Sequence, residues 1–292
     1  MAEFINLSTV SAFFLGCACA SVVLGMVIHR KAQQRVKENI RGTQASLDLL
    51  EKNEHYEEQK FNLAEAGVEL LEKNEIIELA RDQTEKLLFN ILPVTVAHEL
   101  MENGHSQPRQ FERVTVCFAD LEDFTRQSGS LSPQRLIGEL NDIFTAFDAI
   151  TERHNCERLK TIGDAYFSVC GMPTSDDKHA QNIARSALEM VGYLHERNQT
   201  AKLQWKLRIG LHTGPVVGGV VGTKKYIYDA FGDTINIASR MEAHSEPMKI
   251  NTSRDVRELL QNSFRFSPRP PAQVKGKGTM EMYFLDAEND AQ

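Results

Sequence analysis

The sequence predicts an α+β protein, in which a ferredoxin-like βαββαβ domain follows a transmembrane helix and a long coiled-coil-like helix. Three patterns support this: an uncharged N-terminal run, a charged stretch with heptad-spaced apolar residues, and alternating strand and helix signals. The expected parts are an anchor at 1–30, a helical signalling segment at 31–90, a junction and linker at 91–110, a globular domain at 111–286 and a tail at 287–292.

The first predicted element is a membrane-spanning helix. No charged residue occurs from Phe4 to Ile28, and the 19 residues from Val10 to Ile28 are apolar enough and long enough to span a bilayer. Glu3 is the only charge before this run, whereas basic residues follow it at 30, 31, 35 and 37. The positive-inside tendency predicts a single-pass protein of the cell (inner) membrane, with its globular domain in the cytoplasm. A cleaved signal peptide is the alternative, although a basic n-region is missing.

The second predicted element is a long helix from 31 to about 90. This stretch lacks proline, and Leu63, Leu70 and Ile77 recur at heptad spacing. The repeat favours a parallel coiled coil with a second chain, and a single solvated helix is the alternative. The pattern slips at 50–61, where a stutter or a break is expected. Pro93 should end the helix, and 107–112 reads as a linker.

The remaining chain alternates strand and helix signals. Strands are expected at 114–119, 156–161, 165–170, 205–212, 215–221, 225–230 and 280–285, and helices at 132–154, 177–200, 234–243 and 253–261. Ser132 and Pro133 start the first of these helices as cap and first-turn residue. The order βαββαβ predicts a sheet with its helices on one face.

The overall composition limits the classes of function. The chain has 292 residues, of which 41% are hydrophobic and 25% are charged, as in an ordinary globular domain with an appendage. A net charge of -7 argues against nucleic acid as a partner. An odd number of cysteines without metal-type spacing favours a reducing compartment. The five are Cys17, Cys19, Cys117, Cys156 and Cys170.

Two aspartates at strand edges carry the strongest chemical signal. Asp120 follows the apolar run 114–119, and Asp164 lies in a tight turn between two predicted strands. Carboxylates from neighbouring strands can hold two hard cations beside one phosphate group. The pair therefore points to phosphoryl or nucleotidyl transfer.

Three segments that contain these aspartates resemble the signature segments of class III nucleotidyl cyclases. They are 118–125, 160–166 and 229–240, within a resemblance that covers about 88–285. The likeness is to a bacterial-like, single-span, membrane-anchored adenylate cyclase. It implies conversion of ATP to 3′,5′-cyclic AMP and pyrophosphate. The alternatives are a guanylate cyclase and a catalytically silent, cyclase-like module that senses nucleotide or dimerises.

The resemblance also implies a metal and phosphate site. Two Mg²⁺ or Mn²⁺ ions would be held by Asp120, Asp164 and the backbone carbonyl of Leu121. The backbone N–H groups of 122–125, including those of Phe124 and Thr125, would face the phosphates at a helix start. The family usually has glycine where this chain has Asp123, so negative charge is expected beside the triphosphate.

By the same resemblance, further residues contact the rest of the nucleotide. Lys160 and Asp229 match the base-reading pair, and these residue types suit the acceptor and donor of adenine; guanylate-making relatives carry glutamate and a small polar residue there. Asn236 and Arg240 lie four residues apart on one helix face, where Asn236 would position the ribose and Arg240 would stabilise the α-phosphate. Two basic residues would contact the terminal phosphates, namely Lys275 and Lys224.

The family builds each site between two catalytic domains. One domain supplies the metal aspartates, and the other supplies the base-reading pair with the asparagine and the arginine. Because this chain carries all six, the resemblance implies a homodimer with two shared sites. The coiled-coil-like helix would hold the two copies together. An unidentified membrane or cytosolic regulator is expected to act through it.

Overall fold

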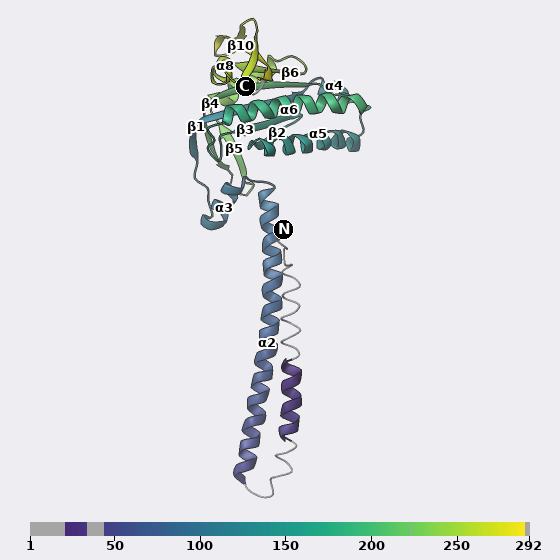
Figure 1. Cartoon of the computed structure of the whole chain (residues 1–292), viewed down its shortest axis with the longest axis vertical. Coiled ribbons are helices and arrows are strands. Elements are labelled where there is room, and N and C mark those ends of the chain that lie inside the picture. Colours follow the sequence, from purple (N-terminus) through teal and green to yellow (C-terminus); the bar gives the residue numbers. More distant parts are fainter. Residues whose placement is uncertain (1–20, 34–43, 223, 290–292) are drawn as a thin grey trace. The chain divides into compact units, whose positions relative to one another are not determined.

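The computed structural model describes residues 21–33, 44–222 and 224–289, and the chain divides into two compact units, Met1–Glu85 and Lys86–Gln292 (Figure 1). Residues 21–33 are helical, while the other half of the predicted span lies outside the described residues. Of the helices in the described ranges, none combines the length and the apolar character needed to span a bilayer.

The predicted long helix is present as α2 (Gln44–Phe89). Of the stutter or break expected at 50–61, the break is wrong, because α2 runs through this stretch without interruption, and the stutter stays a prediction. Seven of the twelve residues at 50–61 are glutamate, lysine or glutamine, which are good helix formers, so intrinsic propensity carries the helix across the slip in the apolar pattern. The side chains of Leu63, Leu70 and Ile77 are exposed in the single chain. The coiled coil stays a prediction.

The second unit begins with the end of α2 and with α3 (Val94–Asn103). The long helix ends before Pro93, as expected, while α3, which directly follows Pro93, was not predicted. Gly104 ends α3 with a φ of 73°, a conformation that suits glycine. The linker expected at 107–112 is wrong in part, because β1 (Arg109–Leu121) already begins there. Residues 109–111 pair with the far end of β4, which local composition does not reveal.

The predicted βαββαβ order is confirmed. It is formed by β1, α5 (Pro133–Arg153), β2 (Glu157–Ile162), β3 (Ala165–Cys170), α6 (His179–Thr200) and β4 (Leu207–Val221). These strands lie in the antiparallel order β2-β3-β1-β4. Ser132 caps α5 by accepting a hydrogen bond from the Arg135 N–H at 3.3 Å, with Pro133 in the first turn.

Additional strands extend this core to an eight-stranded sheet. Beyond β4 lie β6 (Lys249–Ser253), β10 (Met282–Glu288) and β7 (Phe264–Pro268), and β5 (Ile227–Phe231) pairs with the end of β4. The remaining elements are α4 (Phe124–Ser128), α7 (Asp233–Ala243), α8 (Arg254–Leu260) and a small hairpin of β8 (Ala272–Val274) and β9 (Gly278–Met280).

The two strands expected at 205–212 and 215–221 are one continuous strand, β4, so that prediction is wrong. Pro215 suggested a break because it has no N–H for pairing. The partner strand absorbs this irregularity instead, since β1 shifts register between Phe111 and Val114, opposite Pro215. β4 can therefore reach from the core of the sheet to β5.

The two helices of the βαββαβ unit, α5 and α6, lie on one face of the sheet, as expected, and α3 and α7 from outside this unit cover the other face. On β1, Cys117, Ala119 and Leu121 pack in one cluster with α5, α6 and α8. Val116 and Phe118 point the other way and pack in a second cluster with α3 and α7. Since side chains alternate along a strand, Asp120 lies on the face covered by α7.

Candidate active site

The two predicted metal aspartates lie beside one another. Asp120 pairs with Ala165 across β1 and β3, and Asp164 directly precedes Ala165 in the two-residue turn after β2. Gly163, with a φ of 66°, makes this turn possible. Both aspartates line a pocket of about 500 Å³ together with Leu121, Phe124 and Thr125, the other residues expected at the metal and the phosphates.

The electrostatics of this pocket are shaped by close negative charge. Partial burial and the neighbouring Asp120 carboxylate raise the pKa of Asp164 to about 6. Arg208 on β4 lies directly opposite Asp120 and donates a hydrogen bond to its Oδ2 at 2.8 Å. Arg208 was missed in the sequence analysis. Its signal was a charged residue inside the apolar strand 207–211, since charge in such a place is usually paired.

The donor set of the pocket fits a hard cation that is shared with a phosphate ligand. Within the described ranges, no cluster of three or more histidine, cysteine, aspartate or glutamate side chains could hold a metal ion. Asp120 and Asp164 supply two carboxylates, and Mg²⁺ in phosphate sites is commonly bound by one or two carboxylates plus phosphate oxygens and water. The residues present therefore fit Mg²⁺ or Mn²⁺ bound together with a nucleotide.

The expected phosphate-facing backbone is shorter than predicted. The N–H of Glu122 donates to the carbonyl of Lys206 at 2.8 Å, so it is not available to a phosphate. Asp123 has a φ of 58°, a left-handed conformation that glycine adopts best and aspartate tolerates. This explains how an aspartate can occupy the usual glycine position. Its exposed carboxylate is paired with Arg126 at 2.9 Å.

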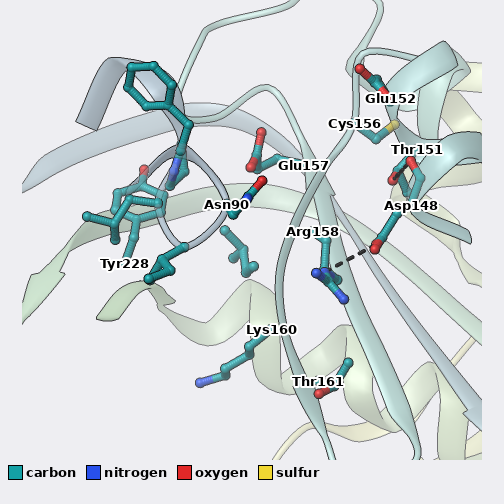
Figure 2. A pocket seen from close by; sticks show the side chains of 15 residues that line it. Asn90, Asp148, Thr151, Glu152, Cys156, Glu157, Arg158, Lys160, Thr161 and Tyr228 are labelled. Atoms are coloured by element: carbon teal, nitrogen blue, oxygen red, sulfur yellow. Dashed lines mark hydrogen bonds and ion pairs between the residues drawn. The ribbon is translucent and has the colours of Figure 1, made fainter. Parts of the chain in front are cut away.

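The predicted base-reading pair is also brought together. Lys160 on β2 donates to Oδ2 of Asp229 on β5 at 2.5 Å, and Oδ1 of Asp229 accepts from the N–H of Ala230. Lys160 also lies on the wall of a second pocket of about 540 Å³, between the junction at 89–93 and β2 (Figure 2). Tyr228, next to Asp229 in sequence, lines the same pocket.

The remaining predicted residues stand apart from the aspartates. Asn236 is exposed and Arg240 half-buried on α7, and neither side chain has a hydrogen bond or ion pair with another described residue. The described lining of the aspartate pocket includes neither of them, nor the Lys160–Asp229 pair. One chain thus presents two separated sets of predicted site residues.

The two predicted terminal-phosphate lysines are both exposed. Lys275 lies in the turn between β8 and β9, and Lys224 precedes β5. Two residues beyond Lys275, Lys277 contacts Asp233 at the start of α7. This contact ties the β8–β9 turn to the helix that carries Asn236 and Arg240.

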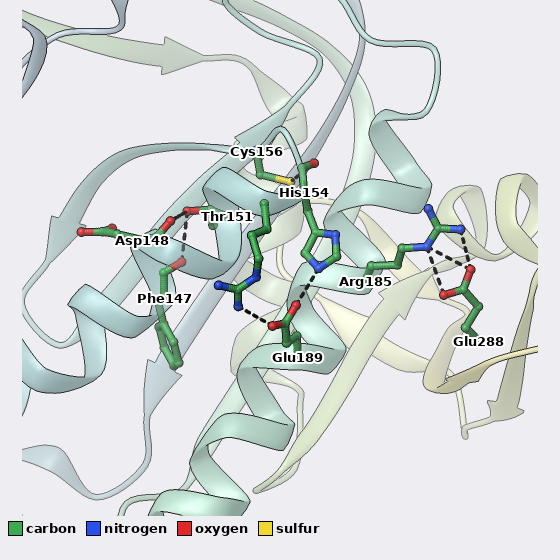
Figure 3. A network of polar contacts seen from close by, with 9 residues as sticks. Phe147, Asp148, Thr151, His154, Cys156, Arg185, Glu189 and Glu288 are labelled. Carbon is green, nitrogen blue, oxygen red and sulfur yellow. Dashed lines mark hydrogen bonds and ion pairs between the residues drawn. The ribbon is translucent and has the colours of Figure 1, made fainter. Parts of the chain in front are cut away.

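A separate polar network supports the opposite face of the sheet (Figure 3). Glu189 on α6 accepts from His154 at 2.7 Å and from Arg153, which fastens the end of α5 to α6. Arg185, also on α6, makes a two-pronged contact with Glu288 at the end of β10. These contacts stabilise the fold in a region that is separate from the candidate site.

Residues 106–287 match the family model of the adenylate and guanylate cyclase catalytic domain, which is more than half of the chain. The chain belongs to the class III nucleotidyl cyclase family. Guanylate cyclase 2D of Rattus norvegicus is 39% identical over 215 residues, which are 72% of this chain and 19% of that protein. Adenylate cyclase of Mycobacterium bovis is 36% identical over 211 residues, 72% of this chain and 48% of that protein.

Solved cyclase structures share the fold. The guanylate cyclase domain of RhGC from Catenaria anguillulae, in complex with GTP, superposes with a TM-score of 0.59 at 34% identity. The match covers 62% of this chain and 100% of that domain. The adenylyl cyclase CyaB from P. aeruginosa also gives a TM-score of 0.59, but at 23% identity this likeness shows the fold alone. Similar cyclases thus include both adenylate and guanylate types.

Proposed function

We propose that this cyclase converts ATP to 3′,5′-cyclic AMP and pyrophosphate. The observation that carries the proposal is the Lys160–Asp229 pair, which lies with its charged atoms 2.5 Å apart on neighbouring elements. Adenine presents a ring-nitrogen acceptor next to an amino donor, which match a lysine donor and a carboxylate acceptor. Guanine presents a protonated ring nitrogen and a carbonyl there, so both contacts would be mismatched.

Overall similarity to guanylate cyclases does not weigh against this choice, because two side chains decide which base fits. A buried polar group left without a partner costs ~1–3 kcal/mol. Two mismatches with guanine would favour ATP over GTP by roughly 30-fold or more in kcat/KM. A guanylate cyclase is the second candidate, because the chain is similar in sequence to rat guanylate cyclase 2D.

The proposed mechanism assigns each residue a separate task. Asp120, Asp164 and the carbonyl of Leu121 would hold two Mg²⁺ or Mn²⁺ ions. When bound, these ions lower the pKa of the ribose 3′-hydroxyl and stabilise the leaving pyrophosphate. Asn236 orients the ribose, and the guanidinium of Arg240 stabilises charge that develops on the α-phosphate.

The triphosphate is bound by groups of both signs. The N–H groups of Phe124 and Thr125 face its oxygens at the start of α4, and Lys275 and Lys224 neutralise its terminal phosphates. Asp123 adds a negative charge at this point, which Arg126 screens through its ion pair. The site thus binds the phosphates despite the missing glycine.

We further infer a homodimer with two shared sites. The aspartate pocket of one chain has, within the described residues, no contact with the chain's own Asn236 or Arg240. A second copy can supply these groups together with its Lys160–Asp229 pair. The heptad-spaced, exposed residues of α2 support a parallel coiled coil that keeps two copies together.

The sequence supports a membrane anchor for this dimer. The uncharged run from Val10 to Ile28 and the basic residues after it favour one span with the cyclase domain in the cytoplasm. An unidentified regulator in the membrane or the cytosol would act through the long helix. Carbonate-extracted membranes should retain the full chain and lose a form without residues 1–30; recovery of both forms in the soluble fraction would contradict the anchor.

Product identification with the purified full chain tests the proposed activity. ATP and GTP are supplied separately with Mg²⁺ and with Mn²⁺, and the products are resolved by chromatography. Cyclic AMP from ATP, with little cyclic GMP from GTP, is the expected result. Cyclic GMP alone would favour the guanylate cyclase, and nucleotide binding without any product would favour the silent module.

A matched variant pair makes the specificity test sharper. Replacing Lys160 by glutamate and Asp229 by serine reverses the polarity of both base contacts. We expect the preference between ATP and GTP to move toward GTP by at least roughly tenfold. Replacing Lys178 by glutamate, on the exposed surface before α6, serves as the charge control and should leave the preference unchanged.

A further inference from the structure

The Arg208 guanidinium lies between two carboxylates that come from different elements. One of its terminal nitrogens is 2.8 Å from Oδ2 of Asp120 on β1 and 3.0 Å from Oε1 of Glu242 on α7. Glu242 is the most enclosed of the three, with 13% of its side chain exposed, against 21% for Asp120 and 30% for Arg208. Neither the sequence motifs nor the proposed mechanism gives Glu242 a task.

Close helix packing fixes Glu242 in this place. A Cβ atom at Gly210 on β4 would lie 1.9 Å from the backbone nitrogen of Glu242 and 2.6 Å from the carbonyl of Ala238. Only glycine therefore allows α7 to approach β4 so closely. Gly210 and Arg208 are two residues apart on one strand, so their side-chain directions point to the same face. The helix end is thus held against the strand beside Arg208.

Glu242 and Arg208 still have unused bonding capacity. The Oε1 of Glu242 and the Nε of Arg208 are both buried without a hydrogen bond in the described structure. The 3.0 Å contact between the two residues is close enough for an ion pair but is not aligned as a hydrogen bond. Oε1 of Glu242 would therefore accept a hydrogen bond from the guanidinium after a rotation of Arg208 toward α7.

Metal binding creates a demand for such a rotation. An arginine bonded to Asp120 occupies a carboxylate oxygen and places a positive charge beside the cations, which repel it. Without a second anionic partner, Arg208 could leave Asp120 only by losing its charge-assisted hydrogen bond in a partly enclosed place. Glu242 offers that second partner.

We propose that Glu242 is a positioning residue that takes over Arg208 when Asp120 binds metal, and thereby sets the divalent-cation affinity of the aspartate pair. The proposal rests on the proposed function, because Asp120 and Asp164 hold metal only under that assignment. It adds a residue on α7, the helix that carries Asn236 and Arg240. The metal site and this helix are then linked within one chain.

Direct Mn²⁺ binding to the full-chain protein, saturated with an ATP analogue that lacks the 3′-hydroxyl, tests the proposal, with free Mn²⁺ measured by electron paramagnetic resonance and binding to the analogue alone subtracted. Glu242→Gln should weaken Mn²⁺ binding roughly tenfold, the lower end for groups that position metal ligands. Glu258→Gln is the control, because Glu258 forms an exposed ion pair with Arg254 on α8, and its loss should change Mn²⁺ binding less than about twofold. Asp120→Asn provides the reference for a lost ligand.

A double-mutant cycle separates a role through Arg208 from a general effect of charge. In an Arg208→Gln background, Glu242→Gln should no longer weaken Mn²⁺ binding. An equal loss in both backgrounds would overturn the proposal, because Glu242 would then act only by its long-range charge. Should Glu242→Gln melt far below the parent protein, Glu242→Asp replaces it in the same cycle, with the same expected pattern from a side chain too short to hold Arg208.

The outcomes also separate this inference from the proposed function. Weaker binding in Asp120→Asn together with unchanged binding in Glu242→Gln would overturn the role of Glu242 and leave the metal assignment standing. Unchanged binding in Asp120→Asn would overturn both. As a second readout, Glu242→Gln should raise the Mg²⁺ concentration for half-maximal rate while leaving the KM for ATP at saturating Mg²⁺ unchanged.

Discussion

The aspartate pocket and the exposed face of α7 differ in how complete they are within one chain. Asp120 is bonded to Arg208, Asp164 lies beside Asp120, and Glu242 encloses the group from α7. On α7, Asn236 and Arg240 have no side-chain hydrogen bond or ion pair with other described residues. One half of the proposed site is therefore assembled by folding, while the other half has its polar groups left for a ligand and a second chain.

The Lys160–Asp229 pair lies between these extremes. Its two members satisfy each other in the single chain, at 2.5 Å, so both are placed before a base arrives. In the proposed site, adenine would share or split this contact when it binds. The comparison teaches that burial and pairing mark groups whose positions are fixed by folding, whereas unpaired exposed groups are available to a ligand or a second chain.

Loss of a metal-holding carboxylate should have the largest effect. Replacing Asp164 by alanine removes one of two carboxylates, and metal assistance is worth several kcal/mol, so kcat should fall by at least about 10³-fold. Steady-state formation of cyclic AMP measures this. Asp177→Ala is the control, because Asp177 is an exposed partner of Arg113 and should leave kcat within about twofold.

The two arginines provide the next contrast, in stability rather than rate. Arg208→Ala leaves Asp120 and Glu242 without their cation, which should lower the free energy of unfolding by about 2 kcal/mol after allowance for partial exposure. Arg240→Ala breaks no contact among the described residues and should change stability by less than about 0.5 kcal/mol. Urea unfolding of both variants decides this. Equal destabilisation by the two substitutions would contradict the distinction between the half of the site that folding assembles and the half with unpaired side chains.

The stability of the fold should depend on pH through a buried group on the strand β4, in contrast to the exposed face of α7. Burial lowers the pKa of His212, which lies on β4 and bonds Ser253 at 2.7 Å. The folded state therefore binds a proton less readily than the unfolded chain. Neutral His212 contributes fully to the stability of the fold above the unfolded pKa of 6.5. This contribution is lost as the pH falls below 6.5, by at most about 1.4 kcal/mol per pH unit.

Unfolding measured between pH 7.5 and 5.5 in the wild type and in His212→Gln tests this. The wild type should lose stability more steeply than the variant below pH 6.5. The difference between the two proteins cancels the contributions of Asp164 and Glu242, whose pKa values burial raises. A variant as pH-sensitive as the wild type would show that His212 is not the responsible group.

The smallest effect is expected at Asp123, which stands where the family usually has glycine. Asp123→Gly relieves a left-handed residue and frees Arg126 for the phosphates, so the KM for ATP should fall about two- to fivefold with kcat nearly unchanged. Steady-state kinetics at saturating metal measure this. A higher KM would mean that the carboxylate of Asp123 helps to bind the nucleotide complex.

Local patterns predicted the core of the fold and the placement of the aspartates. Alternating apolar residues and turn residues are read within a few positions, so the βαββαβ order and the turn that carries Asp164 followed from sequence. The edge elements could not be predicted in this way. The strand β6 (Lys249–Ser253), for example, is formed because it pairs in parallel with β4, a tertiary contact.

The contacts between side chains inside the site could not be predicted for the same reason. Asp120, Arg208 and Glu242 come from three elements that meet only after β1, β4 and α7 pack together. The resemblance to cyclases indicated the residues that are proposed to touch the nucleotide, but not those that hold them in place. Pro215 misled the strand assignment because its missing N–H is compensated by a bulge in another strand.

Complementation between two inactive variants tests the shared site most directly. Asp120→Ala and Arg240→Ala are co-expressed with different tags, and the mixed dimer is purified by both tags. Each mixed dimer then contains one intact site, so it should have about half of the wild-type activity, while each variant alone has almost none. Mixed dimers that form but remain as inactive as the single variants would contradict the account.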